Sequence, residues 1–219
     1  MIGMNALLEI YDKLYRAFGP QHWWPGDTPF EVAIGAILTQ NTSWSNVEKA
    51  IQNLKRQRVL SSKALHEMPV GKLADLVRPA GYFNIKAQRL KSFIGFLIKA
   101  YGGSMKKMKK EEMHTIREKL LGIKGIGPET ADSILLYALE KPSFVIDAYT
   151  KRVLSRHRIL EDGRNYNEFQ ELFHMSLKRD VPLYNQYHAL LVKLGKTYCR
   201  KHKEKCAECP LKTFIHEQV

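Results

Sequence analysis

The chain has 219 residues, of which 44% are hydrophobic, and its formal net charge is +13. No apolar run approaches the roughly 20 residues that a membrane-spanning helix needs, and the amphipathic N-terminus lacks the pattern of a cleavable signal peptide. We therefore expect an intracellular protein with no membrane partner, located in the cytoplasm or nucleoid if its source is prokaryotic. Its excess of lysine and arginine suits a polyanion such as nucleic acid, although composition alone also fits a basic protein without such a partner.

The predicted elements are all helical. Apolar residues recur at helical spacing over residues 4–18, and the loop "GPQHWWPGDTP" follows. The next segment, residues 30–40, is apolar nearly all round, which predicts a buried helix. Further helices are predicted over residues 43–57, 61–69, 71–81, 84–103, 109–122, 128–140, 143–159 after a short extended lead, 165–179 and 184–199. No segment alternates as a strand does, so the fold class is all-α.

A glycine-punctuated turn precedes one of these helices, in "LLGIKGIGPETAD" at residues 120–132. Gly125 and Gly127 can take positive φ without a Cβ clash, and Pro128 suits the first helical position. Backbone N–H groups exposed at such a helix start suit a phosphate. The segment indicates either a helix–hairpin–helix that grips a DNA backbone without reading sequence or an ordinary tight turn.

A single carboxylate follows, in "VIDAYTKRV". Asp147 comes directly after three apolar residues and at the head of a predicted helix. A carboxylate in this place can cap the helix. Because it lies just past a buried stretch, it can also face a cleft.

Several segments together carry a family resemblance. "IKGIGPETADSILLYAL" followed by "FVIDAYTKRVLSR" resembles the helix–hairpin–helix and Gly/Pro-Asp signature of the endonuclease III superfamily of DNA glycosylases. "AILTQNTSWSNVEKA", "LVRPAGYFNIKAQRLK" and "CRKHKEKCAECPLKTFI" resemble its DNA-plugging turn, its central helix pair and its iron–sulfur loop.

The resemblance implies a two-lobed, all-α helix-hairpin-helix glycosylase fold with a C-terminal cysteine loop. One helical lobe, residues 23–135, carries the hairpin. The other lobe, residues 1–22 and 136–219, carries Asp147 and the cysteine loop. The implied partner is double-stranded DNA with a damaged base, and the implied state is a monomer.

The resemblance also bears on the chemistry. Bifunctional members of the superfamily have a lysine where this sequence has Glu129, and that amine forms a Schiff base with the sugar. A glutamate cannot do so, which implies a monofunctional glycosylase of base excision repair. In it, Asp147 stabilises the oxocarbenium ion and activates water. Lys124, in place of the usual hairpin proline, is a stray amine. A bifunctional glycosylase/lyase for oxidised pyrimidines and a non-catalytic lesion-binding protein are therefore the alternatives.

Aromatic residues bear on the substrate. Trp23, Trp24, Pro25 and Trp44 are the expected walls of a pocket for a flipped-out base, with core packing as the alternative for the tryptophans. Tryptophan also favours a cationic base, and Ala36 stands where adenine-mismatch glycosylases have a catalytic glutamate. The sequence is most similar to the 3-methyladenine glycosylase branch, which implies alkylated purines as substrates.

The expected DNA contacts lie in three places. By resemblance Asn41 is the plug that fills the gap left by the extruded nucleotide, since an amide can pair with the orphaned base. A plain helix C-cap is the alternative. The full set of expected DNA-binding residues is Gln40, Asn41, Lys124, Gly125, Gly127, Thr130, Lys151 and Arg152.

Three cysteines, Cys199, Cys206 and Cys209, have C-x6-C-x2-C spacing. A clustered, odd set in a reducing compartment favours metal ligation over disulfides. The resemblance implies a [4Fe–4S] cluster, but Ile215 replaces the family's fourth cysteine, so the ligand set is incomplete unless His216 serves. A zinc site with three cysteines and one histidine and a loop held by packing alone are the alternatives.

Overall fold

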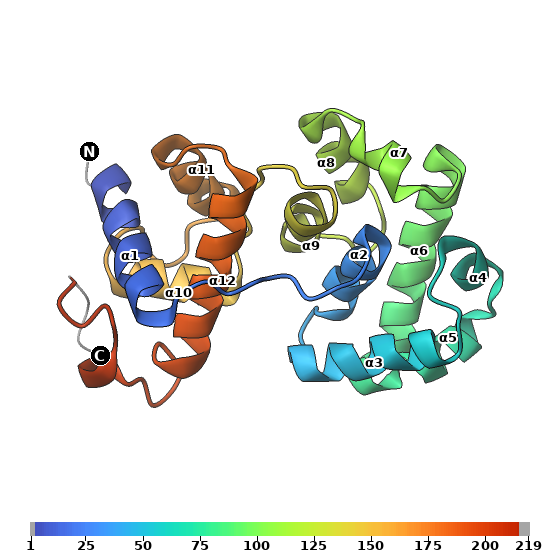
Figure 1. Cartoon of the computed structure of the whole chain (residues 1–219), viewed down its shortest axis with the longest axis horizontal. Coiled ribbons are helices and arrows are strands. Elements are labelled where there is room, and N and C mark those ends of the chain that lie inside the picture. The colour runs from blue at the N-terminus through green and yellow to red at the C-terminus, as the bar shows by residue number, and fades with distance from the viewer. Residues whose placement is uncertain (1–2, 215–219) are drawn as a thin grey trace. The chain divides into compact units, whose positions relative to one another are not determined.

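The computed structural model describes residues 3–214, with side chains from residue 6 onward, and every regular element in that range is a helix. This confirms the all-α prediction. In chain order the elements are α1 (Gly3–Phe18), α2 (Pro29–Leu38), α3 (Trp44–Arg56), α4 (Ser62–Glu67), α5 (Val70–Leu76), η1 (Arg78–Ala80), α6 (Phe83–Tyr101), α7 (Met105–Lys109), α8 (Met113–Leu121), α9 (Pro128–Ser133), η2 (Ile134–Ala138), α10 (Ala148–Arg156), α11 (Tyr166–Ser176), α12 (Val181–Thr197) and η3 (Cys206–Glu208) (Figure 1). None of the helices in the described range is long and apolar enough to cross a bilayer.

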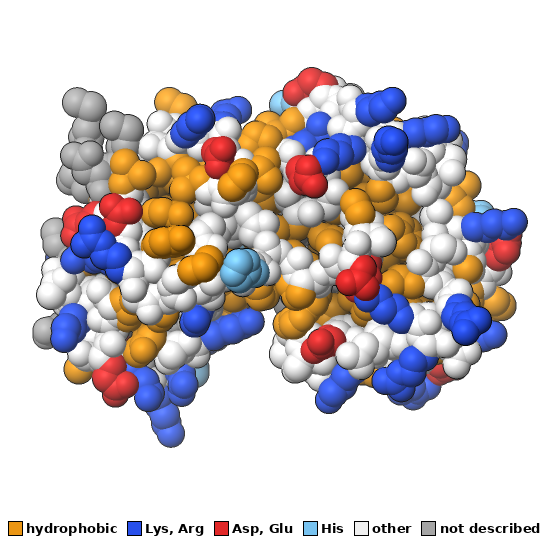
Figure 2. Space-filling model, in the orientation of Figure 1, with side chains coloured by type: hydrophobic (Ala, Val, Ile, Leu, Met, Phe, Trp, Pro, Cys, Tyr) orange, Lys and Arg blue, Asp and Glu red, His pale blue; other side chains and the backbone are white. Residues whose placement is uncertain are grey.

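The chain forms two compact units. One comprises Met1–Trp24 and Pro142–Val219, and the other is Pro25–Lys141. The division expected from the resemblance falls after residues 22 and 135. Lysine and arginine side chains are spread over both units on the face that Figure 2 shows, as the net charge of +13 leads one to expect.

The unit Pro25–Lys141 is built around α2. Every residue from Glu31 to Leu38 is buried, and the helix packs against α3, α6, α9 and η2. Thr28 caps its N-terminus by accepting a hydrogen bond from the Glu31 N–H at 3.1 Å. This confirms the buried helix predicted from the nearly uniform apolar character of residues 30–40, because a helix that is covered on all sides has no polar face.

The unit formed by Met1–Trp24 and Pro142–Val219 has an aromatic core. α1 packs against α11 and α12, and α10 packs against α12. Phe144 stacks on Phe173 with ring centroids 3.7 Å apart, and Tyr187 meets both rings edge-on. The Tyr187 hydroxyl donates to the Leu7 carbonyl at 2.7 Å, which ties the N-terminal helix to the C-terminal ones.

Two details differ from the helices predicted from sequence. The predicted helix 128–140 is α-helical only to Ser133 and continues as a π-helical turn, η2. A π turn is rare and has no pattern of its own in the sequence. The short helix α7 was not predicted, because its five residues, "MKKMK", are too few to show a helical period.

Candidate active site

The helix–hairpin–helix consists of α8, the turn 122–127 and α9. Gly125 has a φ of +91°, and a Cβ at this position would lie 2.4 Å from Cγ of Arg89, so only glycine fits. Gly127 differs from the expectation: its φ is −95°, it caps α9, and a Cβ there would meet nothing within 4 Å. No contact within the protein therefore requires glycine at position 127. The space that a side chain would fill there is open. Lys124 is exposed within the turn, directly before Gly125.

The turn after α2 is hydrogen-bonded to this hairpin within the same unit. The Gln40 amide nitrogen donates to the Gly125 carbonyl at 3.2 Å and to the Thr130 hydroxyl at 2.8 Å. Arg89, from α6, donates to the Gln40 side-chain oxygen. Gln40 thus holds the hairpin in place, whereas its neighbour Asn41 is exposed and left-handed at a φ of 54°. No pattern in the sequence pointed to Arg89.

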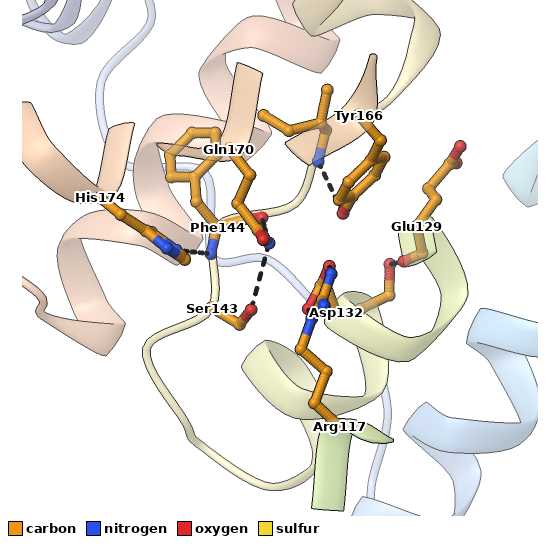
Figure 3. A network of polar contacts seen from close by, with 10 residues as sticks. Arg117, Glu129, Asp132, Ser143, Phe144, Tyr166, Gln170 and His174 are labelled. Carbon is orange, nitrogen blue, oxygen red and sulfur yellow. Dashed lines mark hydrogen bonds and ion pairs between the residues drawn. The ribbon is translucent and has the colours of Figure 1, made fainter. Parts of the chain in front are cut away.

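A bidentate ion pair joins the two helices of the hairpin. Arg117 of α8 donates from Nε and Nη2 to the two carboxylate oxygens of Asp132 in α9, at 2.8 and 2.9 Å (Figure 3). The Asp132 side chain is fully buried and that of Arg117 is 22% exposed. Glu129 is exposed one turn earlier on α9.

Asp147 lies at the N-terminus of α10, in the other unit. Its Oδ1 accepts a hydrogen bond from the Thr150 N–H at 2.7 Å, so the capping role foreseen from sequence is real. Its Oδ2 lies 3.6 Å from Nε2 of His188, and the carboxylate is only 12% exposed. Burial by itself raises the pKa of Asp147, but His188 and the Thr150 N–H outweigh burial, and the pKa falls below its ordinary value. The carboxylate is therefore ionised at neutral pH.

His188 is a site residue that sequence reasoning missed. It lies on α12, is buried, and meets the Phe144 ring edge-on. A lone histidine among apolar residues of a helix gives no signal that separates a core residue from a functional one. Only the fold brings it to Asp147.

The four expected pocket residues are divided between the units. Trp23 and Trp24 are half-buried and form a T-shaped pair with ring centroids 5.5 Å apart. The Lys196 ammonium lies 5.8 Å from the centroid of the Trp23 ring, so this indole attracts a cation within the protein itself. Pro25 and Trp44 belong to the unit Pro25–Lys141, where Trp44 is half-buried at the start of α3.

A further exposed aromatic residue was not foreseen. Tyr82 precedes α6, has a left-handed φ of 46°, and is 68% exposed, with Ile85 also exposed one turn later. It lies in the same unit as the hairpin. An exposed aromatic ring at the tip of a turn can stack on a nucleic acid base.

The two expected basic contacts on α10 have partners in the protein. The Lys151 ammonium lies 5.4 Å from the centroid of the Phe169 ring. Arg152 donates to the carbonyls of Gly195 and Cys199, at 3.2 and 2.8 Å. Arg152 therefore satisfies the Gly195 carbonyl in the last turn of α12, which has no partner within the helix, and the Cys199 carbonyl just beyond the end of the helix.

The cysteine loop does not gather a ligand set among the described residues. Cys199 and Cys209 are buried, Cys206 is exposed, and all three are free thiols. Within residues 3–214 no group of three or more histidine, cysteine or acidic side chains is placed to hold a metal ion. Ile215 and His216 lie outside the described residues.

Arg156 donates to Sγ of Cys199 at 3.5 Å and to the Arg200 carbonyl at 2.7 Å. Burial raises the pKa of the Cys209 thiol. The described residues provide three cysteines, one fewer than the four thiolates of a [4Fe–4S] cluster, and no step of the chemistry below depends on a metal.

Comparison with known proteins identifies the family. Residues 34–179 match the family model described as "HhH-GPD superfamily base excision DNA repair protein". A protein of Methanocaldococcus jannaschii named "Putative DNA repair glycosylase MJ1434" is 47% identical over 212 residues, which are 96% of each chain. Endonuclease III of Thermotoga maritima is 28% identical over 204 residues, covering 93% of this chain and 89% of that one.

A solved structure agrees with these relatives. The crystal structure of the Helicobacter pylori 3-methyladenine DNA glycosylase MagIII bound to 1,N6-ethenoadenine matches with a TM-score of 0.77 and 32% identity, covering 87% of this chain and 97% of that one. The fold and these relatives agree on the class of protein, an enzyme of base excision repair. The chain belongs to the HhH-GPD superfamily of base excision DNA repair proteins, and it is a DNA glycosylase of that family.

Proposed function

We propose that the protein is a monofunctional DNA glycosylase that hydrolyses the N-glycosidic bond of alkylated purines, such as 3-methyladenine, in double-stranded DNA. The observation that carries the proposal is Asp147, a carboxylate that is only 12% exposed and is held ionised by the Thr150 N–H and His188. Glu129 supports the monofunctional mechanism, because it provides no amine at the position of the lyase lysine. The likeness to MagIII supports the substrate class.

The chemistry assigned to Asp147 is electrostatic. As the bond from C1′ to the base lengthens, the electron pair leaves with the base and positive charge develops on the sugar. The Asp147 carboxylate stabilises that charge and accepts a proton from the attacking water, whose oxygen forms the new bond to C1′. An N3-alkylated adenine is cationic before the reaction and leaves as a neutral base, so no strong general acid is needed.

Base recognition is assigned to the indoles and DNA contact to the hairpin unit. The Trp23 ring suits a cationic base, and Trp24, in the same unit, is the second proposed wall. Asn41 and Tyr82, both exposed, are the proposed contacts to bases of the duplex. Lys124 and the backbone around Gly125 and Gly127 are the proposed contacts to phosphate.

A panel of damaged duplexes tests the substrate. Each duplex carries one 3-methyladenine, one thymine glycol, one 8-oxoguanine or one G·T mismatch, and the free base is measured after incubation with the wild-type protein. We expect release of 3-methyladenine at a rate well above that of the other bases, because only this base is both cationic and a good leaving group. Preferential release of thymine glycol or thymine would contradict the proposal.

A bifunctional glycosylase/lyase is the second candidate, favoured by the exposed amine of Lys124 in the hairpin and by the 28% identity to an endonuclease III. Borohydride reduction during turnover separates the two candidates, since only a Schiff base with the sugar becomes a covalent protein–DNA adduct. We expect no adduct with the wild-type protein. An adduct that disappears in the Lys124→Gln variant would establish the bifunctional enzyme instead.

We also predict that the cysteine loop folds without an iron–sulfur cluster, held by Arg152 and Arg156. Iron, zinc and acid-labile sulfide are measured in protein purified without oxygen, and each is expected to be far below one per chain. The melting temperature is expected to be the same with and without a chelator. About four iron atoms per chain, the content of a [4Fe–4S] cluster, would overturn this prediction.

A further inference from the structure

The segment that leads into Asp147 is a buried, extended stretch of chain. Ser143, Phe144, Val145 and Ile146 are each at most 1% exposed, and the described part of the chain contains no β-strand that could pair with them. Buried backbone N–H and C=O groups need hydrogen-bond partners. An extended chain usually finds them in a neighbouring strand, so this segment must find them elsewhere.

Side chains of α11 provide those partners. The Phe144 N–H donates to Nε2 of His174 at 3.0 Å, and the Gln170 amide donates to the Phe144 carbonyl at 2.7 Å. The Ile146 N–H donates to the Tyr166 hydroxyl at 3.3 Å. Figure 3 shows Tyr166, Gln170 and His174 directed from their helix toward this segment.

The spacing of the three side chains explains why one helix can do this. Residues 166, 170 and 174 are four apart and so share one face of α11. The eight residues from Tyr166 to His174 rise about 12 Å along the helix, whereas Phe144 and Ile146 are about 6.6 Å apart along an extended chain. The two outer side chains therefore converge on the segment, His174 and Gln170 on Phe144 and Tyr166 on Ile146. In this way the helix replaces a neighbouring strand for these backbone groups.

We infer that Tyr166, Gln170 and His174, the α11 ladder, are positioning residues for Asp147; this inference rests on the proposed function of that aspartate. The Tyr166 contact fixes the amide of Ile146, one residue before Asp147. The Phe144 contacts fix a residue whose ring also meets His188, the partner of the second Asp147 oxygen. The ladder thus determines where the carboxylate stands, although none of its side chains has been assigned a contact with substrate.

The test compares Tyr166→Phe, which removes only the hydroxyl, with the wild-type protein. Single-turnover base release, measured with enzyme in excess on the best duplex of the panel, is expected to fall about 10-fold to 100-fold, as a misplacement of about 1 Å does elsewhere. DNA affinity is expected to stay unchanged. His174→Phe removes the acceptor of the Phe144 N–H and is expected to show the same loss of rate. His174→Gln keeps an acceptor at this position and is expected to recover most of the rate.

Ile10→Val is the matched control, because Ile10 is fully buried in α1 of the same unit and has no polar contact with the segment. It is expected to lower the melting temperature without lowering the single-turnover rate at a temperature where it is folded. If Tyr166→Phe likewise loses only melting temperature, the ladder is merely structural and the inference is overturned.

A readout without substrate separates this inference from the proposed function. The titration of Asp147, followed by carboxyl-carbon NMR, is expected to move upward in Tyr166→Phe toward the ordinary pKa, because the contact with His188 loosens. An unchanged titration would overturn the inference whatever the activity. If the wild-type protein releases no base from any duplex, the proposed function fails. The titration then still tests whether the α11 ladder positions Asp147.

Discussion

Replacing Asp147 with asparagine is expected to slow base release by about 10²-fold to 10³-fold, the usual loss when one electrostatic stabiliser of a transition state is removed. Asparagine caps helices about as well as aspartate, so the hydrogen bond from the Thr150 N–H can persist. The substitution thus removes the negative charge and leaves the helix cap. The rate is measured in single turnover, and DNA binding by fluorescence anisotropy is expected to be at least as tight as that of the wild-type protein.

Asp180→Asn is the matched control for this substitution. Asp180 caps α12 in the same unit, accepting from the Leu183 N–H at 2.8 Å, as Asp147 caps α10. Its conversion to asparagine is expected to leave the rate unchanged. Equal rates for Asp147→Asn and Asp180→Asn would show that position 147 serves only as a helix cap, and the catalytic assignment would be withdrawn.

Replacing Asp132 with asparagine is expected to lower the free energy of unfolding by about 3 kcal/mol, near the lower end of the range for breaking a buried ion pair. The substitution leaves the Arg117 guanidinium without its charged partner beneath the hairpin, at a place where the carboxylate is fully buried. The remaining 22% exposure of the Arg117 side chain lets water offset part of the loss. Urea denaturation measures the change.

The surface pair of Asp75 and Arg78 provides the comparison, since their side chains are 66% and 61% exposed. Asp75→Asn is expected to change the free energy of unfolding by less than about 1 kcal/mol. The double variant Arg117→Met, Asp132→Leu is expected to recover most of the stability, because it removes both buried charges together. An effect of Asp132→Asn no larger than that of Asp75→Asn would show that the pair does not stabilise the hairpin.

Local signals account for the part of the fold that was predictable. Three features could each be interpreted from one short segment of sequence: the apolar residues of α2, the glycines that end α6 and the turn that precedes α9. Asp147 is likewise recognisable at the head of α10, and the structure shows it as a cap with a second oxygen next to His188. Periodicity, turn residues and helix capping depend on residues close together in the chain, so they can be predicted from the sequence without knowledge of the fold.

The contacts that the sequence did not reveal are long-range. Arg89 reaches Gln40 across 49 positions, and His188 lies 41 positions after Asp147. In the sequence, the residues of the α11 ladder look like ordinary polar residues of an amphipathic helix. Their role depends on contacts with an extended segment that lies 20 to 30 positions earlier in the chain. Gly127 shows the reverse case: its glycine suggested a positive φ, and the chain is extended there.

The most direct test of the central claim follows both products of one reaction. Wild-type protein is incubated with a duplex that carries a single 3-methyladenine, and the free base and the length of the damaged strand are measured in the same sample. The account predicts free 3-methyladenine with a full-length strand that breaks only after treatment with alkali. A strand already broken before alkali, or no free base at all, would contradict it.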